Sequence, residues 1–275
     1  MDYKKYKIID SHCHIFPDKI AQKATDSIDN FYGIGESEDI EVCGFVGNAK
    51  TLLTQCDAVG VDRCLVTSVA TTPHHAQSIN AFIAREVELF PDRFIGFGSL
   101  HPESETLEED AVHLIELGLK GVKLHPDIQN FKVDNPKVIK IFEICNEKKL
   151  PVLVHTGDSR YDNSNPNRVK KILEMFPDLT IIGAHFGGWS LWNEAPRELC
   201  KYKNLYVDTC SSFYALSKEK AREIIDLYGT DRVLFGTDFP LWKQEYELEF
   251  LFSLGLSEKE LEDILHNNIL KIVNA

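Results

Sequence analysis

Runs that read as β-strands alternate with runs that read as α-helices along the whole chain, and this alternation limits the possible folds most strongly. The strand-like runs are short, rich in Val, Ile, Leu or Phe, and bounded by Gly, Pro, Asp or Asn. Eight strands are predicted, at residues 7–14, 62–69, 93–100, 119–125, 151–155, 179–185, 204–209 and 232–237. The expected helices lie in amphipathic stretches, at residues 50–59, 75–90, 104–117, 136–148, 166–175, 191–202, 217–227, 242–252 and 257–273.

This order of elements predicts an α/β fold, namely a (β/α)8 TIM barrel. A doubly wound open sheet has the same alternation, but no glycine-rich fingerprint follows the first strand. No interior linker, low-complexity run or repeat divides the chain, so a single domain over residues 1–275 is expected. One long segment, residues 16–49, reads as irregular and is expected to lie over the barrel mouth as a lid.

Composition restricts the partners and the cellular location. A formal net charge of -13 argues against a nucleic acid or an anionic membrane as the partner, which leaves a small-molecule substrate. No apolar run approaches the roughly 20 residues that span a bilayer. The N-terminus passes directly into a strand with candidate ligands, unlike a signal peptide. The seven cysteines never form a CxxC pair, so a reduced, cytoplasmic protein is expected.

Polar side chains gather where the predicted strands end. His12 and His14 are one residue apart, so their side chains point to the same face of the first strand, with Asp10 below them. TIM-barrel active sites lie at the carboxyl ends of the strands. The ends of the first, fifth, sixth and eighth strands therefore bring together His12, His14, His155, His185 and Asp238. Imidazole and carboxylate ligands suit a divalent metal that activates water for hydrolysis or a related reaction.

The strand-end motifs also resemble a known family. They are IDSHCH at 9–14, GVKLHP at 121–126, VHTG at 154–157, AHFGG at 184–188 and LFGTDFP at 234–240. In this set and order they resemble the amidohydrolase superfamily, specifically the amidohydrolase-2 branch that also contains aminocarboxymuconate-semialdehyde decarboxylase. The resemblance implies one divalent ion, bound by His12, His14, His155 and Asp238. Zinc is the expected ion, manganese and iron remain open, and a homodimer is compatible with this branch.

The resemblance also implies two catalytic residues. His185 is similar to the histidine that activates water or stabilises a developing oxyanion, and in some members this histidine approaches the metal. Asp238 is similar to a metal ligand that also accepts a proton in hydrolytic members. A non-catalytic metal binder would not need His185.

Lys123 is predicted to lie on the inner face of the fourth strand, where an unpaired lysine is costly. One solution is an ion pair with Asp10, beneath the metal. The alternative is a carboxylated lysine that bridges two metals, as in the phosphotriesterase and dihydroorotase relatives. The first solution is favoured because the branch resembled here normally uses one metal.

Four further residues are candidate substrate contacts. Arg160 could bind a carboxylate in bidentate fashion or be a surface charge, and Asp158 could hold a polar substrate group. His125 could contact substrate, support the site from behind, or only pack beneath Pro126. Trp189 could form a wall of the pocket or cap the sixth helix.

Two reactions remain open. Aminocarboxymuconate decarboxylases carry a substrate-binding arginine in the loop after the first strand, whereas residues 16–49 contain none. This difference and the short chain favour hydrolysis of an amide, ester or lactone. The alternative is non-oxidative decarboxylation of a small aromatic or unsaturated carboxylic acid. TatD-type nucleases are disfavoured, because they carry a glutamate where this chain has Ser99-Leu100-His101.

Overall fold

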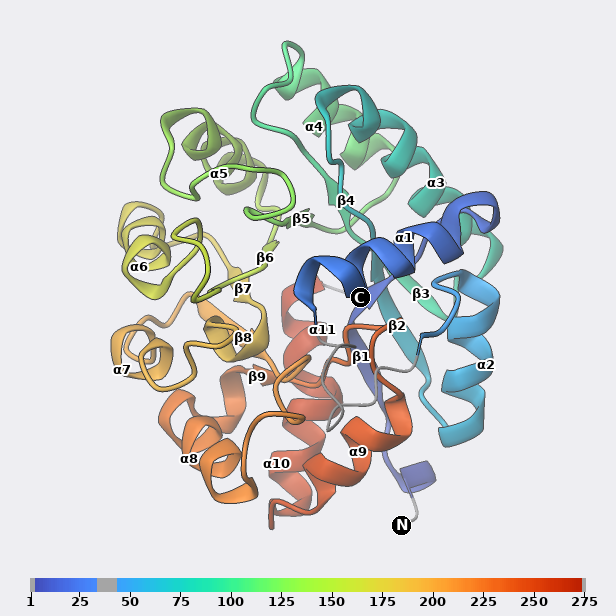
Figure 1. Ribbon diagram of the computed structural model, residues 1–275, viewed down its shortest axis with the longest axis vertical. Helices are drawn as coiled ribbons and strands as arrows, with labels where there is room; N and C mark the ends of the chain where they lie inside the picture. The colour runs from blue at the N-terminus through green and yellow to red at the C-terminus, as the bar shows by residue number, and fades with distance from the viewer. Residues whose placement is uncertain (1–2, 34–43, 274–275) are drawn as a thin grey trace.

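A computed structural model describes residues 3–33 and 44–273 and places a layer of parallel strands inside a layer of helices (Figure 1). The strands are β1 (Ile9–His14), β2 (Arg63–Thr67), β3 (Phe94–Gly96), β4 (Gly98–Ser99), β5 (Val122–Leu124), β6 (Val152–Val154), β7 (Ile181–Gly183), β8 (Leu205–Asp208) and β9 (Val233–Leu234). They pair in the order β1-β2-β3 and β4-β5-β6-β7-β8-β9. Each of the eight predicted strands is present, because β3 and β4 together occupy the third.

Backbone hydrogen bonds close the strands into a barrel. Between β3 and β4, the Phe97 amide donates to the Val66 carbonyl at 3.0 Å, which keeps the two short strands in one wall. At the other seam, the Ser11 amide donates to the Phe235 carbonyl at 2.8 Å, and the Asp238 amide donates to the His12 carbonyl at 2.9 Å. The predicted TIM barrel of the α/β class is therefore confirmed.

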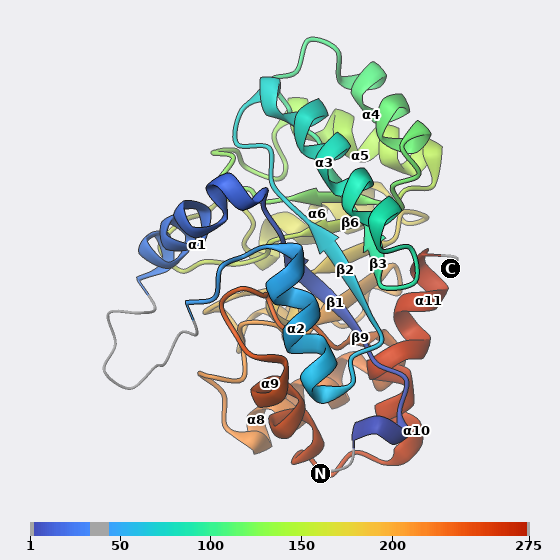
Figure 2. The same ribbon diagram turned by 90° about the vertical axis from the view of Figure 1, so that its right-hand side faces the viewer.

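The helices surround the strands, as Figures 1 and 2 show. They are α1 (Asp18–Tyr32), α2 (Ala49–Val59), α3 (Ala76–Leu89), α4 (Leu107–Glu116), α5 (Pro136–Lys148), α6 (Pro166–Met175), α7 (Ala195–Leu199), α8 (Lys218–Tyr228), α9 (Gln244–Phe252), α10 (Glu258–Glu262) and α11 (Asn268–Val273). Caps explain several boundaries: Ser217 accepts from the Lys220 amide at the start of α8, and Asn135 accepts from the Lys137 amide at the start of α5. None of the described helices has the length and apolar character to cross a membrane.

Apolar side chains fill the inside of the barrel. The interior cluster is formed by Ile9, Leu65, Ile95, Phe97, Leu153, Ile182, Ala184 and Leu234, against which α11 packs Ile269, Ile272 and Val273. Such a filled barrel is a core and not a pore, so its chemistry is confined to the carboxyl ends of the strands.

The segment expected to be irregular contains the 15-residue helix α1, which is a correction to the sequence interpretation. Ile20, Ala24 and Ile28 recur at every fourth position, which is a helical period that the sequence does carry. The helix follows Pro17 and ends at Gly33, whose φ of 64° is a left-handed conformation that glycine adopts readily. In Figures 1 and 2, α1 lies across the carboxyl ends of the strands. Residues 34–43 of the expected lid fall outside the described residues.

Candidate metal centre and active-site pocket

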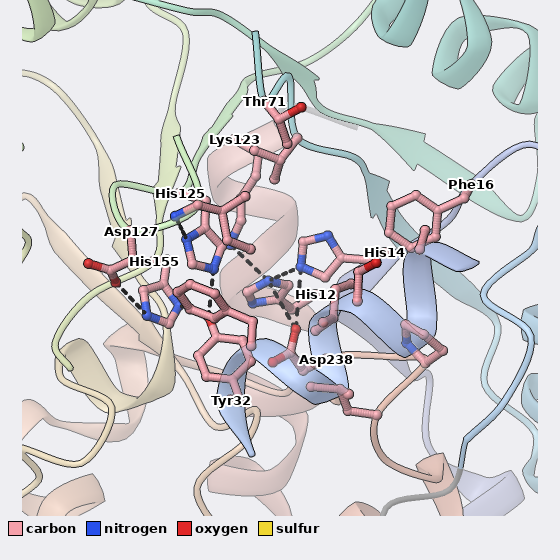
Figure 3. Close-up of a pocket in the computed structure, with 18 of the residues that line it drawn as sticks. His12, His14, Phe16, Tyr32, Thr71, Lys123, His125, Asp127, His155 and Asp238 are labelled. Atoms are coloured by element: carbon pink, nitrogen blue, oxygen red, sulfur yellow. Dashed lines mark hydrogen bonds and ion pairs between the residues drawn. The ribbon is translucent and has the colours of Figure 1, made fainter. Parts of the chain in front are cut away.

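A cavity of about 320 Å³ lies between α1 and the carboxyl ends of the strands (Figure 3). Its polar lining is His12, His14, Tyr32, Lys123, His125, Asp127, His155, His185 and Asp238, with Ser27 and Thr71. Its apolar lining is Phe16, Ala24, Ile28, Phe31, Val69, Ile128, Pro240 and Leu241. All the predicted metal and catalytic residues therefore line one cavity.

Three of the four predicted metal ligands form a compact triangle. The Nε2 atoms of His12 and His14 are 3.2 Å apart. Asp238 Oδ1 lies 3.6 Å from His12 Nε2 and 3.4 Å from His14 Nε2. A tetrahedral ion with bonds of about 2.0–2.1 Å separates its donor atoms by about 3.3 Å. The triangle therefore fits one divalent ion, in both donor type and spacing.

The first strand reaches this geometry through a local irregularity. Its pairing register with β2 shifts between Asp10 and Cys13, in the manner of a β-bulge. Ile9 consequently faces the barrel interior. Asp10 instead accepts hydrogen bonds from the Thr237 amide at 3.0 Å and the Thr237 hydroxyl at 2.6 Å. The prediction that Asp10 lies directly beneath the metal ligands is therefore wrong, because the bulge breaks the simple alternation of side chains.

Asp238 is held in place from two sides. Its backbone has a φ of 61°, an uncommon conformation for a residue with a side chain. The hydrogen bond from its amide to the His12 carbonyl maintains this conformation, and the Ser211 hydroxyl donates to its Oδ2 at 2.6 Å. Only Oδ1 is left to face the two histidines.

Asp208, at the end of β8, is a functional residue that the sequence interpretation missed. Its Oδ2 lies 2.8 Å from His12 Nδ1, and its Oδ1 accepts from the His185 amide at 2.8 Å. Burial alone would raise the pKa of Asp208, but the interactions with His12, His185 and Cys210 together outweigh burial and hold that pKa below its usual value. An ionised Asp208 keeps the His12 proton on Nδ1, so Nε2 presents its lone pair to the triangle. The position of Asp208 at a strand end was the available signal.

Lys123 reaches the same point from β5. Its Nζ lies 2.9 Å from His12 Nε2, and the side chain is fully buried. Within the described residues no contact joins Lys123 to Asp10, so the predicted ion pair is wrong. Burial lowers the pKa of Lys123. Carboxylation of Lys123 stays an untested alternative.

His155, the fourth predicted metal ligand, lies beside His185. His155 Nδ1 is 2.9 Å from His185 Nε2, and the two rings are 4.7 Å apart. The ring of His185 is in turn 5.7 Å from that of His12. His185 therefore neighbours both His12 of the triangle and His155, which suits either of its two predicted roles, as a base or as a further ligand.

The helix α1 contributes Tyr32, which sequence reading did not identify. Its hydroxyl lies 2.6 Å from His125 Nε2. Because the Ile128 amide donates to His125 Nδ1 at 3.3 Å, the proton of a neutral His125 belongs on Nε2 and is donated to Tyr32. The hydroxyl hydrogen of Tyr32 is then not used by His125, and the hydroxyl also lies 3.4 Å from His155 Nδ1. His125 therefore lines the site and orients Tyr32, in addition to stacking on His155 at 4.1 Å.

Arg160 and Asp158 bind each other instead of facing the cavity. Arg160 Nε donates to Asp158 Oδ1 at 3.0 Å, and Nη2 donates to Oδ2 at 2.8 Å. Nη1 donates to the Phe31 carbonyl at 2.9 Å, near the end of α1. Neither Arg160 nor Asp158 is among the described residues that line the cavity. Their observed contacts fasten α1 to the loop after β6, and do not favour the predicted contacts with substrate.

Trp189 forms a side wall near the site. Its ring lies 5.1 Å from that of Tyr32, and it lines a small cleft together with His155 and His185. Gly157 allows the backbone of Trp189 to come this close, because a Cβ atom at position 157 would lie 2.5 Å from the Trp189 backbone nitrogen. The next α-helix along the chain, α7, begins only at Ala195, so Trp189 does not cap it.

Comparisons with known proteins show which family the chain is similar to. The family model described as Amidohydrolase (Amidohydro_2) matches residues 9–274. A curated relative from Dictyostelium discoideum, 2-amino-3-carboxymuconate-6-semialdehyde decarboxylase, is 24% identical over 60% of this chain, and the match spans only 56% of that relative's length.

Two solved structures share the whole fold. An uncharacterized TIM-barrel protein from Bordetella bronchiseptica has a TM-score of 0.82 and 21% identity, with 98% of each chain covered. 5-carboxyvanillate decarboxylase from Novosphingobium aromaticivorans, with manganese and 4-hydroxy-3-methoxy-5-nitrobenzoic acid, has a TM-score of 0.74 and 17% identity, covering 100% of this chain and 98% of that one. Because the family model covers nearly the whole sequence and its strand-end motifs converge on one site, this chain belongs to the Amidohydrolase family.

Proposed function

We propose that this protein is a metal-dependent carboxy-lyase that removes CO2 from a small aromatic or unsaturated carboxylic acid without oxidation. The observation that carries this proposal is the position of Lys123, whose Nζ lies 2.9 Å from His12 Nε2, a predicted metal-ligand atom, in a cavity whose exposed surface is mainly apolar. The lack of arginine in residues 16–49 favoured hydrolysis, but Lys123 supplies a cation for a substrate carboxylate. The two named decarboxylases among the similar proteins also support this alternative more than hydrolysis.

The metal would be held by His12, His14 and Asp238, with His155 as the fourth ligand. This donor set suits zinc, manganese or iron, and manganese is the ion named for the Novosphingobium structure. When bound, the ion supplies a Lewis acid that stabilises negative charge developing on a substrate oxygen.

The apolar walls contribute to the reaction by excluding water. Ile28, Phe31 and Leu241 surround a substrate with little polar surface, and a charged carboxylate is less stable there than uncharged CO2. The bond between the substrate carbon and its carboxyl carbon breaks, its electron pair stays on the substrate carbon, and CO2 leaves. That carbon then takes up one proton.

Tyr32 is placed to supply this proton. Its hydroxyl hydrogen is not used by His125, because its oxygen already accepts from His125 Nε2 at 2.6 Å. Burial raises the pKa of Tyr32 well above its usual value of 10, so the group enters the reaction protonated. The phenolate left after transfer keeps the hydrogen bond from His125 and is reprotonated from water when product leaves.

Within the expected lid and a single domain, the described helix α1 covers this site. Five residues of α1 line the cavity, namely Ala24, Ser27, Ile28, Phe31 and Tyr32. A substrate that enters therefore touches the lid directly, and Tyr32 makes the lid part of the chemistry.

The test is a product analysis on protein loaded with manganese or zinc. Aromatic and unsaturated acids labelled with ¹³C in the carboxyl group are compared with lactones, esters and amides in ¹⁸O-labelled water. Release of ¹³CO2 by the wild type, lost in His12→Ala, supports the proposal. Incorporation of ¹⁸O into a cleaved ester, amide or lactone without CO2 release would overturn it and favour hydrolysis.

A further inference from the structure

Two buried polar atoms face each other without a hydrogen-bond partner. Asp127 Oδ2 and His155 Nε2 lie 3.4 Å apart, and their side chains are 1% and 2% exposed. Neither atom has any other hydrogen-bond partner among the described residues. Buried polar atoms without partners destabilise a fold, so this pair requires an explanation.

The positions of the ring protons explain the conflict. The Cys210 carbonyl can only accept, so His185 Nδ1 carries the proton and donates to it at 3.0 Å. His185 Nε2 is then an acceptor, and His155 Nδ1, 2.9 Å away, must donate to it. A neutral His155 with its proton on Nδ1 has a lone pair on Nε2. That lone pair faces the carboxylate of Asp127, so two acceptors oppose each other.

A metal ligand at the other ring nitrogen removes the conflict. If His155 Nδ1 uses its lone pair for a ligand bond, the ring proton moves to Nε2 and is donated to Asp127 Oδ2. A small shift that shortens and straightens this 3.4 Å contact then gives both unpartnered atoms a hydrogen bond. We propose that Asp127 is a positioning residue, which holds the His155 proton on Nε2 and thereby turns Nδ1 toward the metal. The inference rests on the proposed function in one respect, the assignment of His155 as a ligand.

Asp127 is itself fixed in the orientation that this role needs. Asn163 Nδ2 donates to Asp127 Oδ1 at 2.9 Å, which leaves Oδ2 for His155. Figure 3 shows Asp127 and His155 together on the side of the cavity away from His14. The Asn163 contact also restricts the orientation of a substituted side chain, which makes a sharp experiment possible.

A second ion between Asp127, His155 and His125 is a poorer explanation. These residues offer ligand atoms within 4.8 Å of one another. However, the rings of His125 and His155 are parallel to within 9° and 4.1 Å apart. An imidazole nitrogen points its lone pair in the plane of its own ring, so two parallel stacked rings cannot aim at one ion.

The test replaces Asp127 with asparagine. Asn163 Nδ2 donates to Asp127 Oδ1 in the wild type. In the variant, the amide oxygen of the new asparagine therefore occupies the Oδ1 position, and its NH2 group faces His155 Nε2. The NH2 group can only donate, so it selects the tautomer with the lone pair on Nε2 and the proton on Nδ1. Asp127→Asn should therefore lower zinc affinity about 10- to 100-fold.

Two readouts apply, both independent of turnover. Zinc affinity is measured by competition with a chromophoric chelator, and the His155 tautomer is read by long-range ¹H–¹⁵N NMR with ¹⁵N-histidine, assigned with His155→Gln. In the zinc-loaded wild type, the ring proton of His155 should be on Nε2. In Asp127→Asn, the ring proton of His155 should be on Nδ1. Asp162→Asn, a change at an exposed aspartate, should match wild type, and Asp127→Ala should lose less affinity than Asp127→Asn.

Wild-type zinc affinity in Asp127→Asn, or a proton on Nδ1 of His155 in the zinc-loaded wild type, would overturn the inference. These outcomes do not depend on which reaction the protein catalyses. A protein that binds zinc as expected but releases no CO2 would contradict the proposed function and leave the role of Asp127 intact.

Discussion

His12 Nδ1 and Asp208 Oδ2 lie 2.8 Å apart with both side chains fully buried, so a carboxylate on β8 sets the proton of a ligand on β1. Asp208→Asn should weaken metal binding about 10- to 100-fold, because the ionised acceptor that fixes the His12 tautomer is lost. It should also lower the free energy of unfolding by about 3 kcal/mol, since a buried charged contact loses one partner. Chelator competition and denaturant unfolding measure both effects, with the exposed Asp226→Asn as the control. Unchanged metal affinity would contradict the role of Asp208.

Acid should destabilise the metal-free protein at a pH above the range in which ordinary carboxylates titrate. Burial is the main cause that lowers the pKa of five cavity histidines, His12, His14, His125, His155 and His185. As pH falls below about 6.5, the unfolded chain gains protons that the folded protein does not take up, so the free energy of unfolding falls. Each such histidine contributes up to about 1.4 kcal/mol per pH unit.

Asp127 partly offsets this loss of stability in acid, because burial raises its pKa to about 6. As the pH falls, the folded protein therefore binds this one proton before the unfolded chain does. Thermal unfolding of the metal-free protein at pH 7.5 and pH 5.5 measures the net effect. We expect a lower Tm at pH 5.5, and a constant or higher Tm would contradict the burial of these rings as neutral groups.

Lys123→Met should separate substrate binding from metal binding. The variant should keep metal and lose affinity for the acid identified by CO2 release about ten- to hundredfold, since a charged hydrogen bond to the carboxylate disappears. Calorimetric titration of the metal-loaded protein with a non-reacting analogue of that acid measures the affinity. Equal affinity in the variant and wild type would show that another group binds the carboxylate.

Metal content distinguishes the two states of Lys123. Mass spectrometry of protein purified without a chelator or a metal-affinity tag should give one equivalent per chain, because His12, His14 and Asp238 form one triangle. Two equivalents that depend on added bicarbonate would favour the carboxylated, bridging lysine over the free ammonium group.

Tyr32→Phe should slow turnover more than it weakens binding. Removal of a proton donor costs about a hundredfold or more in kcat, while the ring that walls the cavity remains. Steady-state kinetics on the acid identified by CO2 release measures the split between kcat and KM. Tyr161→Phe is the matched control, because Tyr161 is 42% exposed and stacks on Phe31 beside the same helix end. Equal kcat in Tyr32→Phe and wild type would remove Tyr32 from the mechanism.

The barrel and the ligand triangle were predictable because they depend on local sequence and one rule of fold. His12, His14 and Asp238 each end an apolar run, and parallel strands of a barrel bring such ends together. The position of Asp10 was not predictable, because the bulge in β1 arises from its pairing with β2 and from contacts with Thr237, far along the chain. The alternation of side chains along a regular strand therefore placed Asp10 on the wrong face of β1.

Other differences come from side-chain partners that only the folded chain provides. Arg160 was a reasonable candidate for binding a carboxylate, but Asp158, two residues away, and the end of α1 already accept hydrogen bonds from all three of its nitrogens. Tyr32 could have been found, since the period of Ile20, Ala24 and Ile28 indicates a helix that leads to it. Asp208 could have been predicted if every strand end had been treated as a candidate position.

The hydrogen bond from the Asp238 amide to the His12 carbonyl joins the first and last walls of the barrel at the predicted metal centre. During synthesis on the ribosome, His12 and His14 emerge well before Asp238. Until Asp238 is made, the nascent protein should therefore offer a metal only a two-histidine fragment of weak affinity. The complete centre can form only when the last strand has joined the first, so metal acquisition should report on closed barrels.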